Sequence, residues 1–223
     1  MPAERILLVE GVDDYHVILH LQAGHDLRIV DREEIRQTGG IQPLLESLPV
    51  QLKASDGGIL GVVIDADQDF AARWQSLRAC LASAGYEAIP ESPICTGTIL
   101  APPPETLLPK FGAWLMPDNA SRGILEDFLR FLVPEGDVML PFAEETLRGL
   151  PEQRFSANDY PKALIHTWLA WQKEPGRPFG QAITARFLQS GVPEATVFMA
   201  WLSTLFSERF TARNSSNSPC RRR

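Results

Sequence analysis

The chain has 223 residues, 44% of them hydrophobic and 22% charged, which suits a soluble globular protein with one large domain or an ordinary domain with a helical extension. Its formal net charge of −7 argues against a generic nucleic-acid coat, which would be basic, but not against a nuclease, because the acids of a metal site contribute to that charge. No apolar stretch approaches the roughly 20 residues of a membrane helix and the N-terminus lacks a signal-peptide pattern, so we expect a cytoplasmic protein without a membrane span.

The first predicted element is a short strand that ends in an acid. The apolar residues 6–9 stop at Glu10, and residues 13–22 then read as a helix. Asp13 and Asp14 fall in the first turn of this helix, where carboxylates interact favourably with the helix dipole. The dipole gives both aspartates a purely structural interpretation, which stands beside a functional one for Asp14.

The most informative stretch of the chain follows a second predicted strand at 27–31 and a predicted helix at 41–52. Residues 61–69 hold an apolar run that ends in three acids at alternate positions, Asp65, Asp67 and Asp69. Such a run is typical of a strand buried on both faces of a parallel sheet. Its acids would lie at the carboxyl end, where open α/β sheets bind ligands, and would repel one another unless protons or a divalent ion neutralised them.

The alternation of strands and helices continues beyond these acids. Residues 70–84 predict an amphipathic helix closed by Gly85, because glycine suits the left-handed position that follows a helix. One or two further strands are expected within 86–100. This order predicts an α/β fold with a mostly parallel, doubly wound sheet and helices on both faces.

A third strand that ends in an acid is expected at 112–118, which finishes in Asp118. The helix predicted at 121–132 carries Glu126 in its first half. A solvated helix face is one interpretation of Glu126. Its position directly after a strand that should lie beside the central one is an argument for the other interpretation, a site residue.

The character of the sequence changes at residue 134, beyond which no convincing strand is found. We therefore predict an α/β domain at 1–133, a helical extension packed on it at 134–210 and a disordered tail at 211–223. The helices of the extension are expected at 142–149, 160–172, 179–189 and 193–208.

Two short motifs resemble the Toprim domain of topoisomerases, bacterial primases and nucleases of the overcoming-lysogenization-defect family. The first strand reads Val9-Glu10-Gly11-x-x-Asp14, and the central one reads Asp65-x-Asp67-x-Asp69. The resemblance covers roughly the first 130 residues, and the spacing of Asp14 from Glu10 looks most like the nucleases. It implies a Toprim-like Rossmannoid fold.

The resemblance also implies roles for individual residues around Mg²⁺ or Mn²⁺. Glu10 would be a metal ligand or general acid/base, Asp65 and Asp67 metal ligands, and Asp14 a ligand of a second ion. Asp69, Asp118 and Glu126 are reserve candidates. Lys162, which opens a predicted helix, resembles the lysine that helps to bind the scissile phosphate in those nucleases; a surface lysine is the alternative.

Three functions remain open from the sequence. The first is a Mg²⁺-dependent phosphoryl-transfer enzyme, most simply a nuclease that acts on DNA or RNA. The second is a non-catalytic metal- and nucleic-acid-binding regulator, or a subunit of a larger complex with a protein partner. The third is another Rossmann-like phosphotransferase or phosphatase, which Glu10 disfavours because such enzymes carry an aspartate on the first strand. The chain has no GxxxxGK[ST] phosphate loop, so the ATPase of many related nucleases is missing. The sequence leaves the oligomeric state open.

Overall fold

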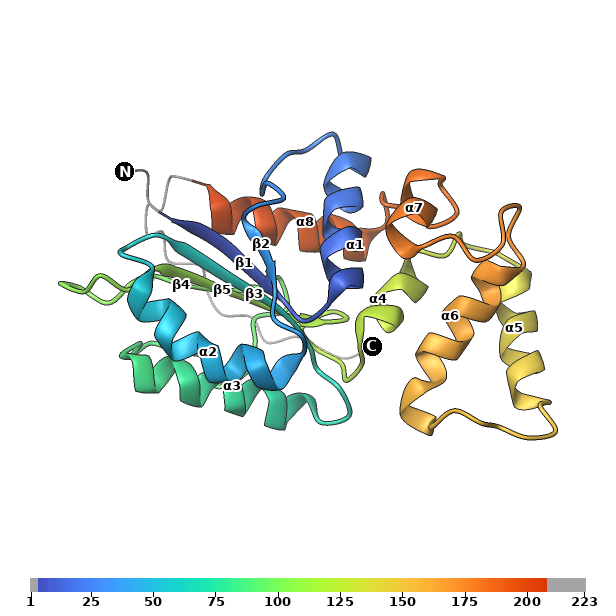
Figure 1. The fold of residues 1–223 in the computed structure, drawn as a ribbon, viewed down its shortest axis with the longest axis horizontal. Helices are drawn as coiled ribbons and strands as arrows, with labels where there is room; N and C mark the ends of the chain where they lie inside the picture. Colours follow the sequence, from blue (N-terminus) through green and yellow to red (C-terminus); the bar gives the residue numbers. More distant parts are fainter. Residues whose placement is uncertain (1–3, 208–223) are drawn as a thin grey trace.

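The computed structural model describes residues 4–207, so the predicted tail at 211–223 lies outside the described part of the chain. Its centre is a five-stranded sheet in the order β2-β1-β3-β5-β4, with only the short edge strand β4 antiparallel (Figure 1). The predicted α/β class with a mostly parallel sheet is therefore confirmed. The strands are β1 (Arg5–Val9), β2 (Ile35–Gln37), β3 (Ile59–Asp65), β4 (Thr98–Leu100) and β5 (Lys110–Met116).

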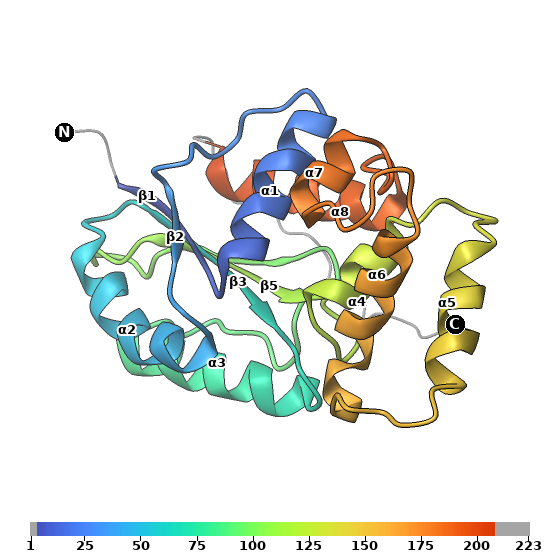
Figure 2. The same cartoon turned by 45° about the vertical axis from the view of Figure 1, so that its right-hand side comes forward.

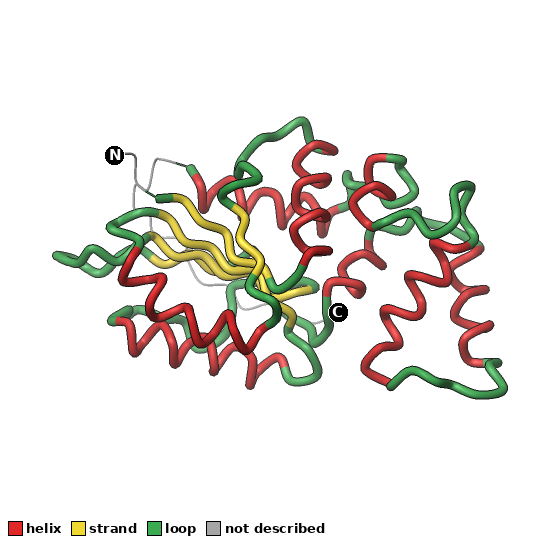
Figure 3. Tube along the Cα trace, viewed as in Figure 1, coloured by secondary structure: helices red, strands yellow, loops and turns green. Residues whose placement is uncertain are grey.

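Helices cover both faces of the sheet, because successive residues of its strands point to opposite sides. In β1, Ile6 and Leu8 join the apolar cluster under α2 (Ile41–Ala54) and α3 (Phe70–Ala84). Leu7 and Val9 join the cluster formed with α1 (Val12–Gly24) and α8 (Pro193–Phe206). Figure 3 shows the strands lying between these two helical layers.

Two glycines allow α8 to lie close to the sheet. A Cβ atom at Gly61 of β3 would come within 2.8 Å of a methyl carbon of Leu205, and one at Gly112 of β5 within 2.4 Å. These distances are shorter than any real packing contact, so only glycine fits at either position while Leu205 stays in place.

The remaining helices lie beyond the carboxyl ends of the strands and beside α1. In Figure 2, α4 (Leu125–Phe131) lies between the end of β5 and α6 (Tyr160–Ala170). Trp168 of α6 and Phe179 of α7 (Phe179–Thr184) belong to the same apolar cluster as the sheet residues under α8. Within residues 4–207, no helix combines the length and apolar character needed to cross a membrane. The same region contains α5 (Met139–Arg148) and the 3₁₀ turn η1 (Ala157–Asp159).

The helix predicted at 70–84 has these bounds in the structure, and Gly85 ends it with a φ of 114°. The strand predicted at 27–31 is wrong, since the second strand is β2, at Ile35–Gln37. The buried side chain of Gln22 explains the difference. Its Oε1 accepts hydrogen bonds from the N–H groups of Ile29 and Val30, and its Nε2 donates to the carbonyl of Val30, so a side chain supplies the partners that a neighbouring strand would offer.

Two predicted helices are shorter than expected by more than two residues. The helix at 121–132 begins only at Leu125, because Gly123 first pairs with Asp67 through two backbone hydrogen bonds. The helix at 179–189 ends at Thr184, because Arg186 adopts a left-handed φ of 61° and the N–H of Phe187 turns back to the carbonyl of Ala182.

Candidate functional site

The structure brings acids together where β1 and β3 end. These strands are parallel neighbours, so Glu10 and Asp65 emerge at the same edge of the sheet. One carboxylate oxygen of Glu10 accepts a hydrogen bond of 2.7 Å from the N–H of Asp65. Asp65 in turn accepts one of 2.9 Å from the N–H of Leu125, the first residue of α4. Hydrogen bonds to acid side chains thus connect the ends of β1 and β3 with the helix that follows β5.

Two more carboxylates reach this edge from the first turns of α1 and α4. Asp14 is 8% exposed and accepts a hydrogen bond of 3.0 Å from the N–H of Gly11, just before α1. Glu126 of α4 is 6% exposed. Acids this buried are rare unless a partner compensates for their charge.

Neighbouring acids raise the pKa values of Asp65 and Asp14 in this cluster. Burial, followed by the charges of Asp14, Glu10 and Glu126, raises the pKa of Asp65 to about 9. Burial raises the pKa of Asp14 to about 7, and the charges of Glu10 and Glu126 add to this effect. Burial also raises the pKa values of Glu10 and Glu126. At neutral pH the cluster therefore retains protons unless a cation replaces them.

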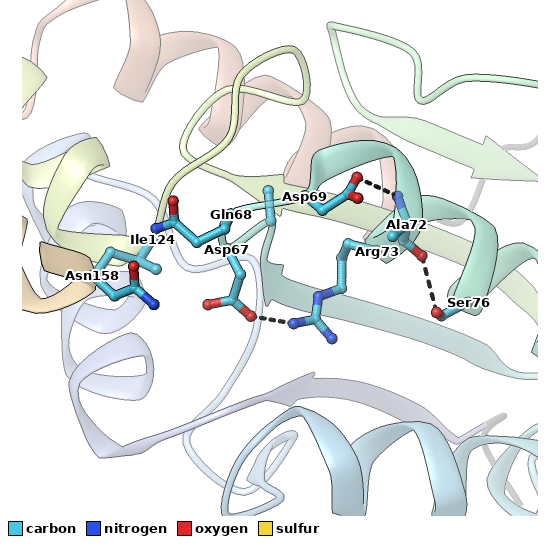
Figure 4. A pocket seen from close by; sticks show the side chains of 9 residues that line it. Asp67, Gln68, Asp69, Ala72, Arg73, Ser76, Ile124 and Asn158 are labelled. Carbon is cyan, nitrogen blue, oxygen red and sulfur yellow. Dashed lines mark hydrogen bonds and ion pairs between the residues drawn. The ribbon is translucent and has the colours of Figure 1, made fainter. Parts of the chain in front are cut away.

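Asp67 lies beside this cluster but faces Arg73 of α3, with which it forms an ion pair (Figure 4). Its backbone is left-handed, with a φ of 55°, a conformation that aspartate tolerates better than most residues. The N–H of Asp67 donates to the carbonyl of Gly123 at 2.8 Å, and the N–H of Gly123 donates back at 2.9 Å. The main chain of Asp67 is thus held at both its donor and its acceptor.

An open pocket of about 360 Å³ adjoins the ion pair. Asp67, Gln68 and Arg73 line one part of it, and Asn158 of η1 lies across from them beside Ile124 (Figure 4). The helical region after residue 134 therefore contributes a polar side chain to the surroundings of the acids.

The other predicted site residues are placed differently. Asp69 caps α3 by accepting a hydrogen bond from the N–H of Ala72, and Asp118 accepts hydrogen bonds from the turn that follows β5. Both carboxylates thus have local structural partners. Lys162 is exposed on α6, and its charge lowers the pKa of Glu126, which places it at the rim of the cluster.

The acids do not form a ready metal cage. In residues 4–207, no three His, Cys, Asp or Glu side chains are arranged to hold a metal ion as they stand. Asp67 is occupied by Arg73, and Glu10 and Asp65 each accept a hydrogen bond from a backbone N–H. A metal ion bound by Asp67 would require that side chain to leave Arg73.

Sequence reasoning did not identify Arg73 and Asn158. Arg73 follows Asp69 by four residues, in the first turns of the helix that begins after the acidic loop, and this spacing was an available signal. Nothing in the sequence links Asn158 to that loop, because their proximity depends on how η1 and α6 pack.

A family model described as "Protein of unknown function (DUF3226)" matches residues 4–207. No curated protein and no solved structure matches the chain.

Proposed function

We propose that this chain, which belongs to the DUF3226 family, is a Mg²⁺- or Mn²⁺-dependent phosphoryl-transfer enzyme, most simply a nuclease that acts on DNA or RNA. The observation that carries the proposal is the cluster of Glu10, Asp14, Asp65 and Glu126 at one edge of a parallel sheet, in which Asp14 and Glu126 are buried and Glu10 and Asp65 are half-buried. Ionising all of these carboxyl groups is unfavourable, and a divalent cation would stabilise their ionised form.

The donor set fits a hard ion, because each of these side chains offers only oxygen. Glu10 and Asp65 would hold the ion together with Asp67, and Asp14 with Glu126 would hold a second one. Such ions supply charge neutralisation at the attacking and leaving oxygens of a phosphate. Lys162 at the rim would add a positive charge where the transition state gathers negative charge.

The Toprim resemblance agrees with this proposal. The two motifs that carry it lie at the ends of β1 and β3, which are adjacent and parallel. Cys80 and Cys95 are free thiols, which suits the cytoplasmic location expected from the sequence. Nucleic acid is the partner that a nuclease requires.

A non-catalytic metal-binding regulator or subunit is the second candidate. The ion pair of Asp67 with Arg73 favours it, because the pair withdraws one acid from the set that two catalytic ions would need, whereas a single non-catalytic ion needs fewer ligands. The two candidates differ in turnover and not in metal binding.

Cleavage assays with the purified full chain test the proposal. Plasmid DNA, single-stranded DNA and RNA are incubated with Mg²⁺, Mn²⁺ or EDTA. We expect cleavage that needs the metal and falls at least about 100-fold in Asp65→Asn, the order expected for removing one electrostatic contributor to catalysis. Asp56→Asn is the matched control, since Asp56 is exposed in a turn and its left-handed φ of 44° also suits asparagine. Metal binding without cleavage of any substrate would favour the regulator, and full activity of Asp65→Asn would exclude this cluster as the active site.

A further inference from the structure

Arg73 is only partly used by the fold. Its terminal NH₂ bonds Asp67, yet its Nε–H is buried and, among the described residues, has no hydrogen-bond partner. The side chain is 16% exposed, against 49% for Asp67. A guanidinium carries five N–H donors in one plane, and a single carboxylate bonded to one terminal nitrogen satisfies only a part of them.

The guanidinium also lines the open pocket beside the acids (Figure 4). The volume of about 360 Å³ lies at the lower end of the range for small-ligand sites. The amides of Gln68 and Asn158 and the hydroxyl of Ser76 contribute further polar groups to its lining. Arginine beside amide donors is suited to a phosphate group, which a guanidinium binds through two parallel hydrogen bonds.

Asp67 can change partner without a change of fold. Its backbone is fixed on both sides by hydrogen bonds to Gly123, so only the side chain has to rotate. Half of that side chain is already exposed, so rotation displaces few packed atoms. The backbone of Arg73, in contrast, is held in the helix, because its N–H donates a hydrogen bond to the carbonyl of Asp69.

We propose that the Asp67–Arg73 ion pair is exchanged on ligand binding: Asp67 turns to a divalent ion at the acid cluster, and the released guanidinium binds the phosphate of a substrate in the adjoining pocket. This inference rests on the proposed function, because it requires a divalent ion beside Glu10 and Asp65. It assigns the pocket to a phosphate ester of about one nucleotide in size. Arg73 becomes a substrate-binding residue that also makes metal and phosphate binding interdependent.

The exchange has a consequence of definite sign. Before metal binds, Arg73 competes for Asp67 and repels the incoming cation, so its removal should preserve or strengthen metal binding. A residue that only positioned Asp67 would have the opposite effect, because its loss would weaken the metal site. After the exchange Arg73 holds phosphate, so metal should strengthen phosphate binding, and by linkage phosphate should strengthen metal binding equally.

Calorimetry on the full chain distinguishes these cases. Mn²⁺ is titrated into wild type, Arg73→Gln and Arg73→Lys, and thymidine 5′-monophosphate is then titrated with and without saturating Mg²⁺. Arg148→Gln is the matched control, because it removes a surface arginine paired with Glu144 on α5, outside the residues that line the pocket.

We expect Mg²⁺ to strengthen nucleotide binding by wild type and by Arg148→Gln at least about 10-fold, within the usual range of coupling between sites. Arg73→Gln should bind Mn²⁺ at least as tightly as wild type and lose most of this gain. Arg73→Lys, which keeps the charge without the planar fork, should fall between them.

Weaker Mn²⁺ binding by Arg73→Gln would overturn the inference, and so would an undiminished gain in nucleotide affinity. Wild type that binds no Mn²⁺ would overturn the exchange together with the metal site. Wild type that shows the coupling but cleaves no nucleic acid would refute the proposed catalysis and leave the exchange standing.

Discussion

Replacing Asp65 with asparagine should stabilise the protein in metal-free buffer. In the folded chain, burial and the surrounding acids raise the pKa of Asp65 to about 9, against an ordinary value of 3.8. At any pH between these two pKa values, Asp65 holds a proton in the folded chain that it has released in the unfolded chain. Asparagine needs no proton, and its side-chain oxygen can still accept the hydrogen bond from Leu125.

The size of the effect follows from the pKa shift. Neutral pH lies about three pH units above the unfolded pKa, and each unit corresponds to about 1.4 kcal/mol, so Asp65 lowers the free energy of unfolding at pH 7 by about 4 kcal/mol. For a chain of this length, that equals a rise in Tm of about 8–16 °C in Asp65→Asn.

The sign of the pH dependence is equally definite. The folded pKa lies above the unfolded one, so the folded state binds more protons, and the contribution of Asp65 to stability is lost as pH rises from about 4 to about 9. The advantage of Asp65→Asn should therefore grow by about 1.4 kcal/mol per pH unit, or by about 4 kcal/mol between pH 5 and pH 8.

Urea denaturation of wild type and Asp65→Asn in EDTA at pH 5, 6, 7 and 8 measures this slope, with Asp56→Asn as the control. Repeating the series with Mg²⁺ tests the ligand role, because ion binding stabilises only a protein that retains the site. An advantage of Asp65→Asn that is equal at pH 5 and pH 8 would refute the electrostatic reasoning. An equal response to Mg²⁺ in wild type and variant would refute Asp65 as a ligand.

Two further predictions concern the lysines. Lys162→Ala should retain Mn²⁺ binding by calorimetry and lose most plasmid cleavage, because a cation at the rim stabilises the transition state more than it affects metal binding. Undiminished cleavage would assign Lys162 to the surface. Lys110→Met should lower the free energy of unfolding by about 2 kcal/mol in urea denaturation, since a buried ammonium that donates to the carbonyls of Thr204 and Leu205 is lost from the end of α8. Unchanged stability of Lys110→Met would show that these hydrogen bonds contribute nothing net.

Prediction from sequence succeeded where the signals were local. The helix at 70–84 ends at a left-handed glycine, a signal that is read from the residue next to the helix. Apolar runs that stop at Glu10 and Asp65 located two strand ends, since a parallel sheet places such ends at one edge. The α/β class follows from that alternation of strands and helices.

The prediction failed where a distant side chain decides the local structure. Gln22 holds residues 29 and 30 out of the sheet, and no pattern within 27–31 shows this. The acids Asp69 and Asp118, whose role as reserve metal ligands stays a prediction, accept hydrogen bonds from N–H groups two or three residues away. Asp65 and Glu10 have backbone partners 60 and 55 residues away. Sequence spacing alone does not separate an acid that caps its own turn from one that faces a site.

The metal-free fold tolerates this cluster of buried and half-buried acids because helix N-termini surround it. The N–H groups at the starts of α1, α2 and α4 are hydrogen-bonded to Asp14, Glu10 and Asp65 respectively, and each helix presents the positive end of its dipole to the cluster. Arg73 adds a full positive charge, which lowers the pKa of Glu10. These groups offset only part of the repulsion, since the pKa of Asp65 still reaches about 9. The remaining imbalance is what a divalent ion would remove, and Arg73 is the one of these positive groups whose partner, Asp67, can turn to that ion.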